Sequence, residues 1–206
     1  DAGIADAGIT DAGIADAWQL VDETLLRLRP VGSLLDCQQA LSAIDAAFQS
    51  QPLVLLHGED GAGKTVTAGE YARREALAGH TQGQPVIYTS WLSCWNLTDL
   101  LESFGQVYEQ SLMERQVEWQ GLEDFQRRKL VQDLAKKVPF LWIWDDFEAL
   151  EERRAWKREE KTALQELLGA FSVGGGRLLI LSRGEGPALL GQLAARVPLR
   201  LTRLAR

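Results

Sequence analysis

The sequence predicts a three-layer α/β sandwich built on a five-stranded parallel sheet, and three segments carry this prediction. Leu53–Leu56 and Phe140–Trp144 are continuous apolar runs, which is typical of parallel strands that are covered on both faces. Arg177–Arg183 has an apolar centre and a polar end. Because ligands bind at the carboxyl ends of strands in open α/β sheets, we expect the functional residues to follow these three strands.

The composition is that of an ordinary globular protein, with 206 residues and a net charge of −7. Binding nucleic acid generally needs an excess of Lys and Arg, so the acidic balance argues against a nucleic-acid partner. Cys37 and Cys94 are far apart and have no Cys-x-x-Cys companions, so we expect free, buried thiols in the reducing cytoplasm. No apolar run has the length of a membrane span and no leader resembles a signal peptide, so no membrane partner is expected.

Residues 1–30 are expected to form a low-complexity leader with a short helix, before a domain over residues 31–206. Residues 1–17 repeat the unit Asp-Ala-Gly-Ile-Ala with a period of five, which matches neither the helix nor the strand period. We favour a flexible leader, and the alternative is one edge of a stacked repeat. The chain begins with Asp1 rather than Met, so we expect a piece of a longer polypeptide.

Two N-terminal helices are expected before the first strand, and they form a helical extension of the sandwich. Apolar residues at helical spacing predict a helix over Trp18–Leu28, which Pro30 ends. A second amphipathic pattern predicts a helix over Leu34–Phe48.

The segment after the first strand fits the phosphate-binding loop pattern G-x-x-x-x-G-K-[ST]. Its glycines let the backbone approach a phosphate, and its N–H groups converge at the start of a helix expected over Val66–Ala78. Lys64 is expected to reach the outer phosphates, and the Thr65 hydroxyl to bind Mg²⁺. The alternative is a glycine-rich turn that matches by chance. The predicted nucleotide-binding residues are Gly58, Glu59, Asp60, Gly61, Ala62, Gly63, Lys64, Thr65 and Val66.

Three elements are expected between the loop and the second apolar run: a strand over Pro85–Ser90, a helix from Leu97 towards Glu118, and a helix over residues 122–137. Trp91 and Trp95, which follow the strand, either contact a partner as an exposed pair or belong to the core, as most Trp pairs do. The last helix has an apolar face expected to pack inwards, made of Leu122, Phe125, Leu130 and Leu134.

Asp145 and Asp146 directly follow the second apolar run, which is the Walker B pattern. Asp145 is expected to hold Mg²⁺ through a water molecule, because Mg²⁺ keeps much of its hydration shell. Asp146, with Glu148 as second choice, is expected to orient the attacking water. The alternative is that these acids only cap the next helix.

Arg183 ends the strand over Arg177–Arg183, whose carboxyl end should lie beside that of the phosphate-loop strand. Arg183 is therefore expected to face the γ-phosphate as a sensor that reports its presence, and it is counted among the catalytic residues. The alternative is an ordinary surface arginine. For strands numbered along the chain we expect the sheet order two, three, one, four, five. The place of the fourth strand is left open, either between the phosphate-loop strand and the strand before Asp145 or beside the phosphate-loop strand. The remaining expectations are a solvated loop or helix face in the charge run Glu151–Lys161, helices over Leu164–Phe171 and Pro187–Ala195, and a fifth strand over Val197–Leu201.

Residues 31–202 resemble the nucleotide-binding domain of STAND ATPases, the signal-transduction NTPases related to NB-ARC and NACHT modules, and are most similar to bacterial multidomain members. Residues 56–65, 142–148, 179–183 and 195–199 carry the resemblance. It implies that ADP holds the protein closed and that ATP exchange lets it assemble and activate an attached effector. Two features depart from the family: Val31-Gly32-Ser33 lacks an arginine beside the adenine, and the sequence ends at Arg206 without a helical lid or winged helix.

We therefore expect a nucleotide-switched module that binds Mg²⁺ with ATP or ADP and hydrolyses ATP slowly. Its expected partners are other domains of the parent protein and further copies of itself on activation. One alternative is a module in which nucleotide is only a structural ligand for protein contacts, but Asp145 and Asp146 count against it. The other is a nucleic-acid-dependent AAA-like ATPase, against which the acidic balance counts.

Overall fold

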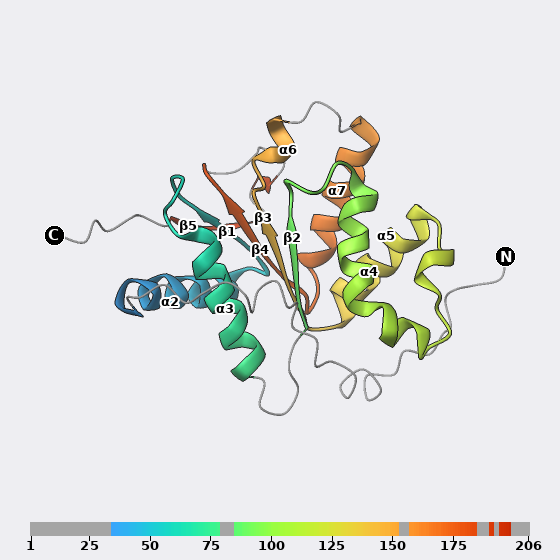
Figure 1. The fold of residues 1–206 in the computed structure, drawn as a ribbon, viewed down its shortest axis with the longest axis horizontal. Helices are drawn as coiled ribbons and strands as arrows, with labels where there is room; N and C mark the ends of the chain where they lie inside the picture. Colours follow the sequence, from blue (N-terminus) through green and yellow to red (C-terminus); the bar gives the residue numbers. More distant parts are fainter. Residues whose placement is uncertain (1–33, 79–84, 153–156, 185–189, 192–193, 199–206) are drawn as a thin grey trace.

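The computed structural model describes residues 34–78, 85–152, 157–184, 190–191 and 194–198. Its centre is a five-stranded sheet in which every neighbouring pair of strands is parallel, as the sequence predicts. Figure 1 shows the strands with their carboxyl ends on one side, where the turn leading to α6 also lies. The strands are β1 (Leu53–His57), β2 (Val86–Ser90), β3 (Leu141–Asp145), β4 (Arg177–Ser182) and β5 (Ala195–Pro198).

The order of the strands across the sheet is β2-β3-β4-β1-β5. β4 lies between β1 and β3 and pairs with both, which is one of the two places that the sequence left open for it. The written order, with β1 next to β3, is therefore wrong only in the place of this strand. Apolar runs show which strands are buried on both faces, but the lateral neighbours of a strand depend on long-range packing that the runs do not encode. The arrangement places the end of β4 between the phosphate loop and the acids that follow β3.

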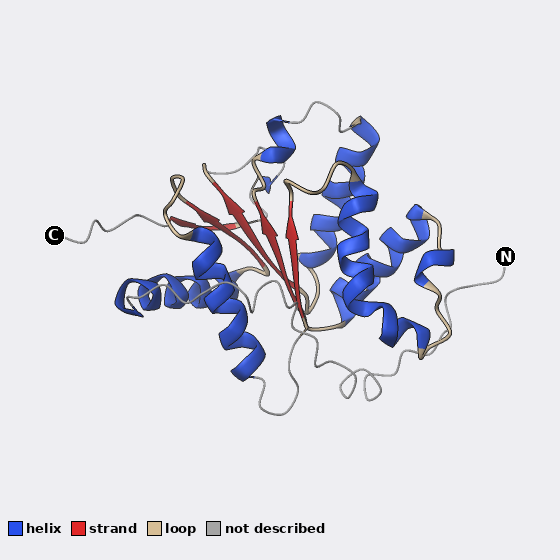
Figure 2. Cartoon of the chain, viewed as in Figure 1, coloured by secondary structure: helices blue, strands red, loops and turns tan. Residues whose placement is uncertain are grey.

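Helices cover both faces of the sheet, which gives the three layers that the sequence predicts (Figure 2). α2 and α3 lie on one face, and α4, α5 and α7 lie on the other (Figure 1). The helices are α2 (Leu34–Ser50), α3 (Lys64–Ala78), α4 (Leu97–Met113), α5 (Asp124–Lys137), α6 (Ala149–Glu152) and α7 (Arg158–Phe171), and a short 3₁₀ helix, η4, spans Trp119–Gly121.

Successive residues of each central strand point into two separate cores. In β1, Leu53 and Leu55 contribute to the core beneath α4, α5 and α7, whereas Val54 and Leu56 contribute to the core beneath α2 and α3. The first core is rich in aromatic rings, and it fixes β3 through the buried indoles of Trp142 and Trp144. This double burial explains why the sequence of the central strands is continuously apolar.

Several local expectations are corrected by the structure. Phe125 does not pack inwards with Leu134, because its side chain is 56% exposed at the start of α5, whereas Leu122 and Leu130 are partly buried. Trp91 and Trp95 form neither an exposed nor a buried pair, since Trp91 is 1% and Trp95 62% exposed.

Helix boundaries also differ from the expectations. α4 ends at Met113 instead of continuing towards Glu118. α7 begins at Arg158 instead of Leu164, within the charge run that is expected to be a solvated loop or helix face. An amphipathic pattern places the helix, but the exact start and end are set by caps and tertiary contacts.

Cys94 is buried, as predicted. The side chain of Cys37, the leader, the helix over Trp18–Leu28 and the boundary at residues 30 and 31 lie outside the described residues, as do most of the helix expected over Pro187–Ala195 and the end of the fifth strand. Within the described part of the chain, no helix combines the length and the apolar character needed to cross a membrane.

Candidate functional site

The loop between β1 and α3 has the backbone geometry of a phosphate-binding loop. Gly61 and Gly63 have φ angles of +74° and +86°, in the left-handed region that favours glycine. The Gly58 N–H donates to the carbonyl of Ser182 at 3.3 Å, which ties the start of the loop to the end of β4. The helix that follows begins at Lys64, so the free N–H groups and the positive end of the helix dipole lie at the loop.

The Lys64 ammonium group is held above this loop. It donates to the carbonyl oxygens of Gly58 at 2.8 Å and Glu59 at 3.0 Å, and it lines the same pocket as Gly61 and Gly63. A cation and a helix N-terminus therefore face one space, which favours an anionic ligand.

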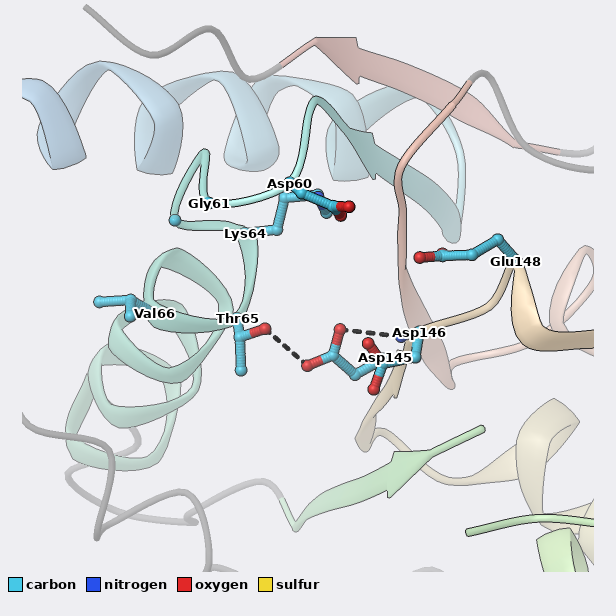
Figure 3. A pocket seen from close by; sticks show the side chains of 9 residues that line it. Asp60, Gly61, Lys64, Thr65, Val66, Asp145, Asp146 and Glu148 are labelled. Atoms are coloured by element: carbon cyan, nitrogen blue, oxygen red, sulfur yellow. Dashed lines mark hydrogen bonds between the residues drawn. The ribbon is translucent and has the colours of Figure 1, made fainter. Parts of the chain in front are cut away.

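Asp145, at the end of β3, is 4% exposed, and its carboxylate accepts three hydrogen bonds. Its Oδ2 accepts from the Thr65 hydroxyl at 2.7 Å and from the Tyr88 hydroxyl at 2.9 Å, and its Oδ1 accepts from the backbone N–H of Asp146 at 2.8 Å. Figure 3 shows Thr65 and Asp145 pointing toward one another from the start of α3 and the end of β3. The two residues predicted to serve the metal therefore meet, although 80 positions separate them in sequence.

Asp146 occupies a left-handed conformation with a φ of +57°, which turns the chain sharply after β3. Its Oδ2 accepts a hydrogen bond of 2.8 Å from the Ser90 hydroxyl. Partial burial raises the pKa of the Asp146 carboxyl above its usual range, and the charge of Asp145 raises it further, against the lowering effect of the Ser90 hydrogen bond. Its protonation is therefore sensitive to the neighbouring groups.

Glu148 and Arg183 form an ion pair at the edge of the pocket. Glu148 accepts from the Arg183 Nε at 2.6 Å and from the Arg183 backbone N–H at 3.2 Å. Arg183 also approaches the phosphate loop, since its Nη1 lies 3.8 Å from Asp60. Glu148, the second choice for orienting the attacking water, is therefore hydrogen-bonded to Arg183, the residue expected to face the γ-phosphate.

These side chains surround a pocket of about 390 Å³, which lies within the range of small-molecule sites. Its lining combines four carboxylates with one lysine, so its electrostatics suit a phosphate ligand only together with a cation. Three of the predicted nucleotide-binding residues, Gly58, Glu59 and Ala62, belong to the loop but do not line the pocket. Arg183 does not line the pocket either, but it contacts the lining residues Asp60 and Glu148. The lining residues are Asp60, Gly61, Gly63, Lys64, Thr65, Val66, Asp145, Asp146 and Glu148.

Sequence reasoning did not identify Tyr88 and Ser90 as residues of the site. Both are polar residues near the carboxyl end of β2, and in the register of the sheet Ser90 lies opposite Asp145. The rule that ligands bind at the carboxyl ends of parallel strands could have found them.

The fold is similar to that of several proteins of known structure. The Aeropyrum pernix ORC2 protein, solved as ADPNP-ADP complexes, has a TM-score of 0.61 at 16% identity, over 82% of this chain and 48% of that one. The A. pernix ORC1 protein in complex with DNA has a TM-score of 0.60 at 16% identity, over 85% and 48%. Cdc6p from Pyrobaculum aerophilum has a TM-score of 0.57 at 14% identity, over 85% and 49%.

This chain therefore spans about half the length of these proteins. It matches no protein-family model and no curated protein. At these identities the similarity concerns the fold, and the fold is that of a P-loop NTPase.

Proposed function

We propose that this chain is a nucleotide-binding module of a P-loop ATPase, which binds ATP or ADP together with Mg²⁺ and hydrolyses ATP slowly. The observation that carries the proposal is the 2.7 Å hydrogen bond between the Thr65 hydroxyl and the Asp145 carboxylate beside the phosphate loop. Oxygen ligands of this kind, in small number, suit Mg²⁺, which is commonly bound by one or two protein groups plus phosphates and water.

In this proposal each group acts on a different part of the ligand. The loop N–H groups and Lys64 bind the phosphates, and Thr65 and Asp145 hold the cation, which when bound neutralises the charge that develops on the phosphates. The Asp146 carboxylate orients the attacking water, and Arg183 faces the γ-phosphate. The four carboxylates of the pocket support the need for a cation, since they would otherwise repel a triphosphate.

The motifs shared with STAND ATPases support a finer proposal, in which the exchange of ADP for ATP controls assembly and the activity of attached domains. One observation favours a second candidate, a nucleic-acid-dependent AAA-like ATPase. The proteins of similar fold include an ORC1 protein solved in complex with DNA. DNA should therefore be tested as a partner of this chain, although the net charge of −7 disfavours general binding to the phosphates of nucleic acid.

The test is an equilibrium titration of the purified protein with fluorescent ATP and ADP, with and without Mg²⁺, beside Lys64→Ala. A hydrogen bond to a charged group contributes about 1.5–3 kcal/mol, so Lys64→Ala should weaken ATP binding at least about tenfold while the protein stays folded. Unchanged affinity in this variant would remove the phosphate loop from the site.

Phosphate release with and without duplex DNA then separates the candidates. Slow release that DNA does not change supports the switch, whereas release that DNA stimulates favours the second candidate. If nucleotide binds without Mg²⁺ and no phosphate is released, the nucleotide is a structural ligand only.

A further inference from the structure

The contact between Glu148 and Arg183 joins two strand ends at the pocket. Glu148 lies in the turn after β3, and the Phe147 N–H in this turn donates to the carbonyl of Leu181 in β4 at 3.0 Å. The turn is thus fastened to β4 two residues before Arg183. From this anchored position Glu148 accepts from both the side chain and the backbone of Arg183, at 2.6 and 3.2 Å.

These two hydrogen bonds restrict the direction of the arginine side chain. The Nε atom lies at the base of the guanidinium group, so a bond at Nε together with one at the backbone N–H fixes both ends of the aliphatic stem. The Nη1 atom, at the far end, is then on the side of the phosphate loop, 3.8 Å from Asp60. Figure 3 shows Glu148 extended toward Asp60 and Lys64, whereas Asp145 points to Thr65.

The contact with Asp60 is of a different kind from that with Glu148. The Asp60 side chain is 77% exposed and the pair is separated by 3.8 Å, so solvent screens the attraction and the contact is weak. The Glu148 side chain is 20% exposed and closer to Arg183, so this pair is held more firmly. A phosphate placed on the loop would replace Asp60 more readily than Glu148.

We propose that Glu148 is the positioning residue for Arg183, and that Arg183 distinguishes ATP from ADP only in the orientation that Glu148 imposes. This inference rests on the proposed function and assigns Glu148 a role other than orienting water. When a triphosphate binds, the Nη1 end of Arg183 leaves Asp60 for the γ-phosphate while Nε stays on Glu148. ADP has no group at that place, so its binding depends less on the pair.

The test is a double-mutant cycle with Glu148→Gln, Arg183→Ala and the combined variant. Each protein is titrated at equilibrium with ADP and with a non-hydrolysable ATP analogue, both in the presence of Mg²⁺. The quantity compared is the ratio of the two affinities. Glu166→Gln is the matched control, because Glu166 is exposed on α7 and does not line the pocket. Circular dichroism and thermal melting verify that each variant is folded.

Glu148→Gln should lower the preference for the ATP analogue about fivefold or more, with a smaller change in ADP affinity. In the Arg183→Ala background the same substitution should have no further effect on the ratio. An unchanged ratio in Glu148→Gln, or an equal loss in both backgrounds, would overturn the inference and return Glu148 to an independent role. A wild-type protein that binds neither nucleotide would instead refute the proposed function, and the inference with it.

Discussion

Asp146 combines a carboxyl group whose pKa is raised with a hydrogen bond from the Ser90 hydroxyl that lowers this pKa. If its carboxylate orients the attacking water, Asp146→Asn should lower turnover by about 100-fold or more while Mg-ATP still binds, because Asp145 keeps its charge. A phosphate-release assay beside a nucleotide titration measures both quantities. Turnover at the wild-type rate would move the role to Glu148 or outside this chain.

The pH dependence of turnover provides a second prediction for the same residue. The pKa of Asp146 is raised, mainly by burial, so protonation inactivates it at a higher pH than an ordinary aspartate, and turnover should fall as the pH is lowered through that point. The Ser90 hydrogen bond lowers this pKa, so Ser90→Ala should move the acid limb of the pH profile to still higher pH. If the acid limb of the pH profile is at the same pH in Ser90→Ala as in the wild type, it reports the titration of a group other than Asp146.

Tyr88 is predicted to tune the affinity for Mg²⁺ because its hydroxyl donates to Asp145 Oδ2 at 2.9 Å. Partners that orient a metal-binding carboxylate typically change metal affinity 10–100-fold when they are lost. Tyr88→Phe keeps the ring and should raise the Mg²⁺ concentration needed for half-maximal nucleotide binding about tenfold. The same titration without Mg²⁺ is the control, and an equal loss in both conditions would show that Tyr88 acts on packing instead.

At the scale of elements, α4 depends on the absence of a side chain at Gly105. A Cβ at this position would overlap the indole of Trp119, which donates to Glu102 and lies against the guanidinium of Arg127. Gly105→Ala should therefore destabilise the protein by about 1–3 kcal/mol through overpacking. Denaturant unfolding followed by circular dichroism measures the change.

Gly169 in α7 is the matched control for this prediction. Apart from the chain neighbours and the backbone of its own helix, no atom lies within 4 Å of the place that a Cβ would take there, and Gly169 has no positive φ. Gly169→Ala should be neutral or stabilise the protein by up to about 1 kcal/mol, because alanine loses less conformational freedom in a helix. If both variants lose the same stability, the Trp119 contact is not the reason.

At the scale of the whole molecule, the pocket joins residues from the start of α3 and from the turn after β3, so a ligand there should stabilise the sheet as a unit. A ligand present at 100 times its Kd stabilises the folded state by about 2.7 kcal/mol. For a chain of this length we expect Mg-ATP to raise the Tm by roughly 5–10 °C.

Differential scanning fluorimetry measures this shift, with two controls. Adenosine, which lacks phosphates, should leave the Tm unchanged at the same concentration. Mg-ATP should raise the Tm of Lys64→Ala by about half as much as that of the wild type, or less, because a tenfold loss of affinity lowers the stabilisation to about 1.4 kcal/mol. A shift with adenosine alone would place the main binding energy outside the phosphate loop.

The fold class and the two halves of the site can be predicted from local patterns in the sequence. Continuous apolar runs predicted parallel strands covered on both faces, and glycine spacing predicted a loop whose Gly61 and Gly63 have positive φ angles. These features are local, because they follow from the conformational preferences of neighbouring residues and from the burial of one segment. The acids after Trp144 were recognisable for the same reason.

The order of the strands, and the side-chain contacts between neighbouring strand ends, depend on tertiary packing. β4 lies between β1 and β3, which brings Arg183 to Glu148, and β2 pairs with β3, which brings Tyr88 and Ser90 to the two aspartates. Each of these pairs joins residues that are at least 35 positions apart. Such contacts depend on how whole strands pack laterally, and strand composition alone is compatible with more than one lateral order.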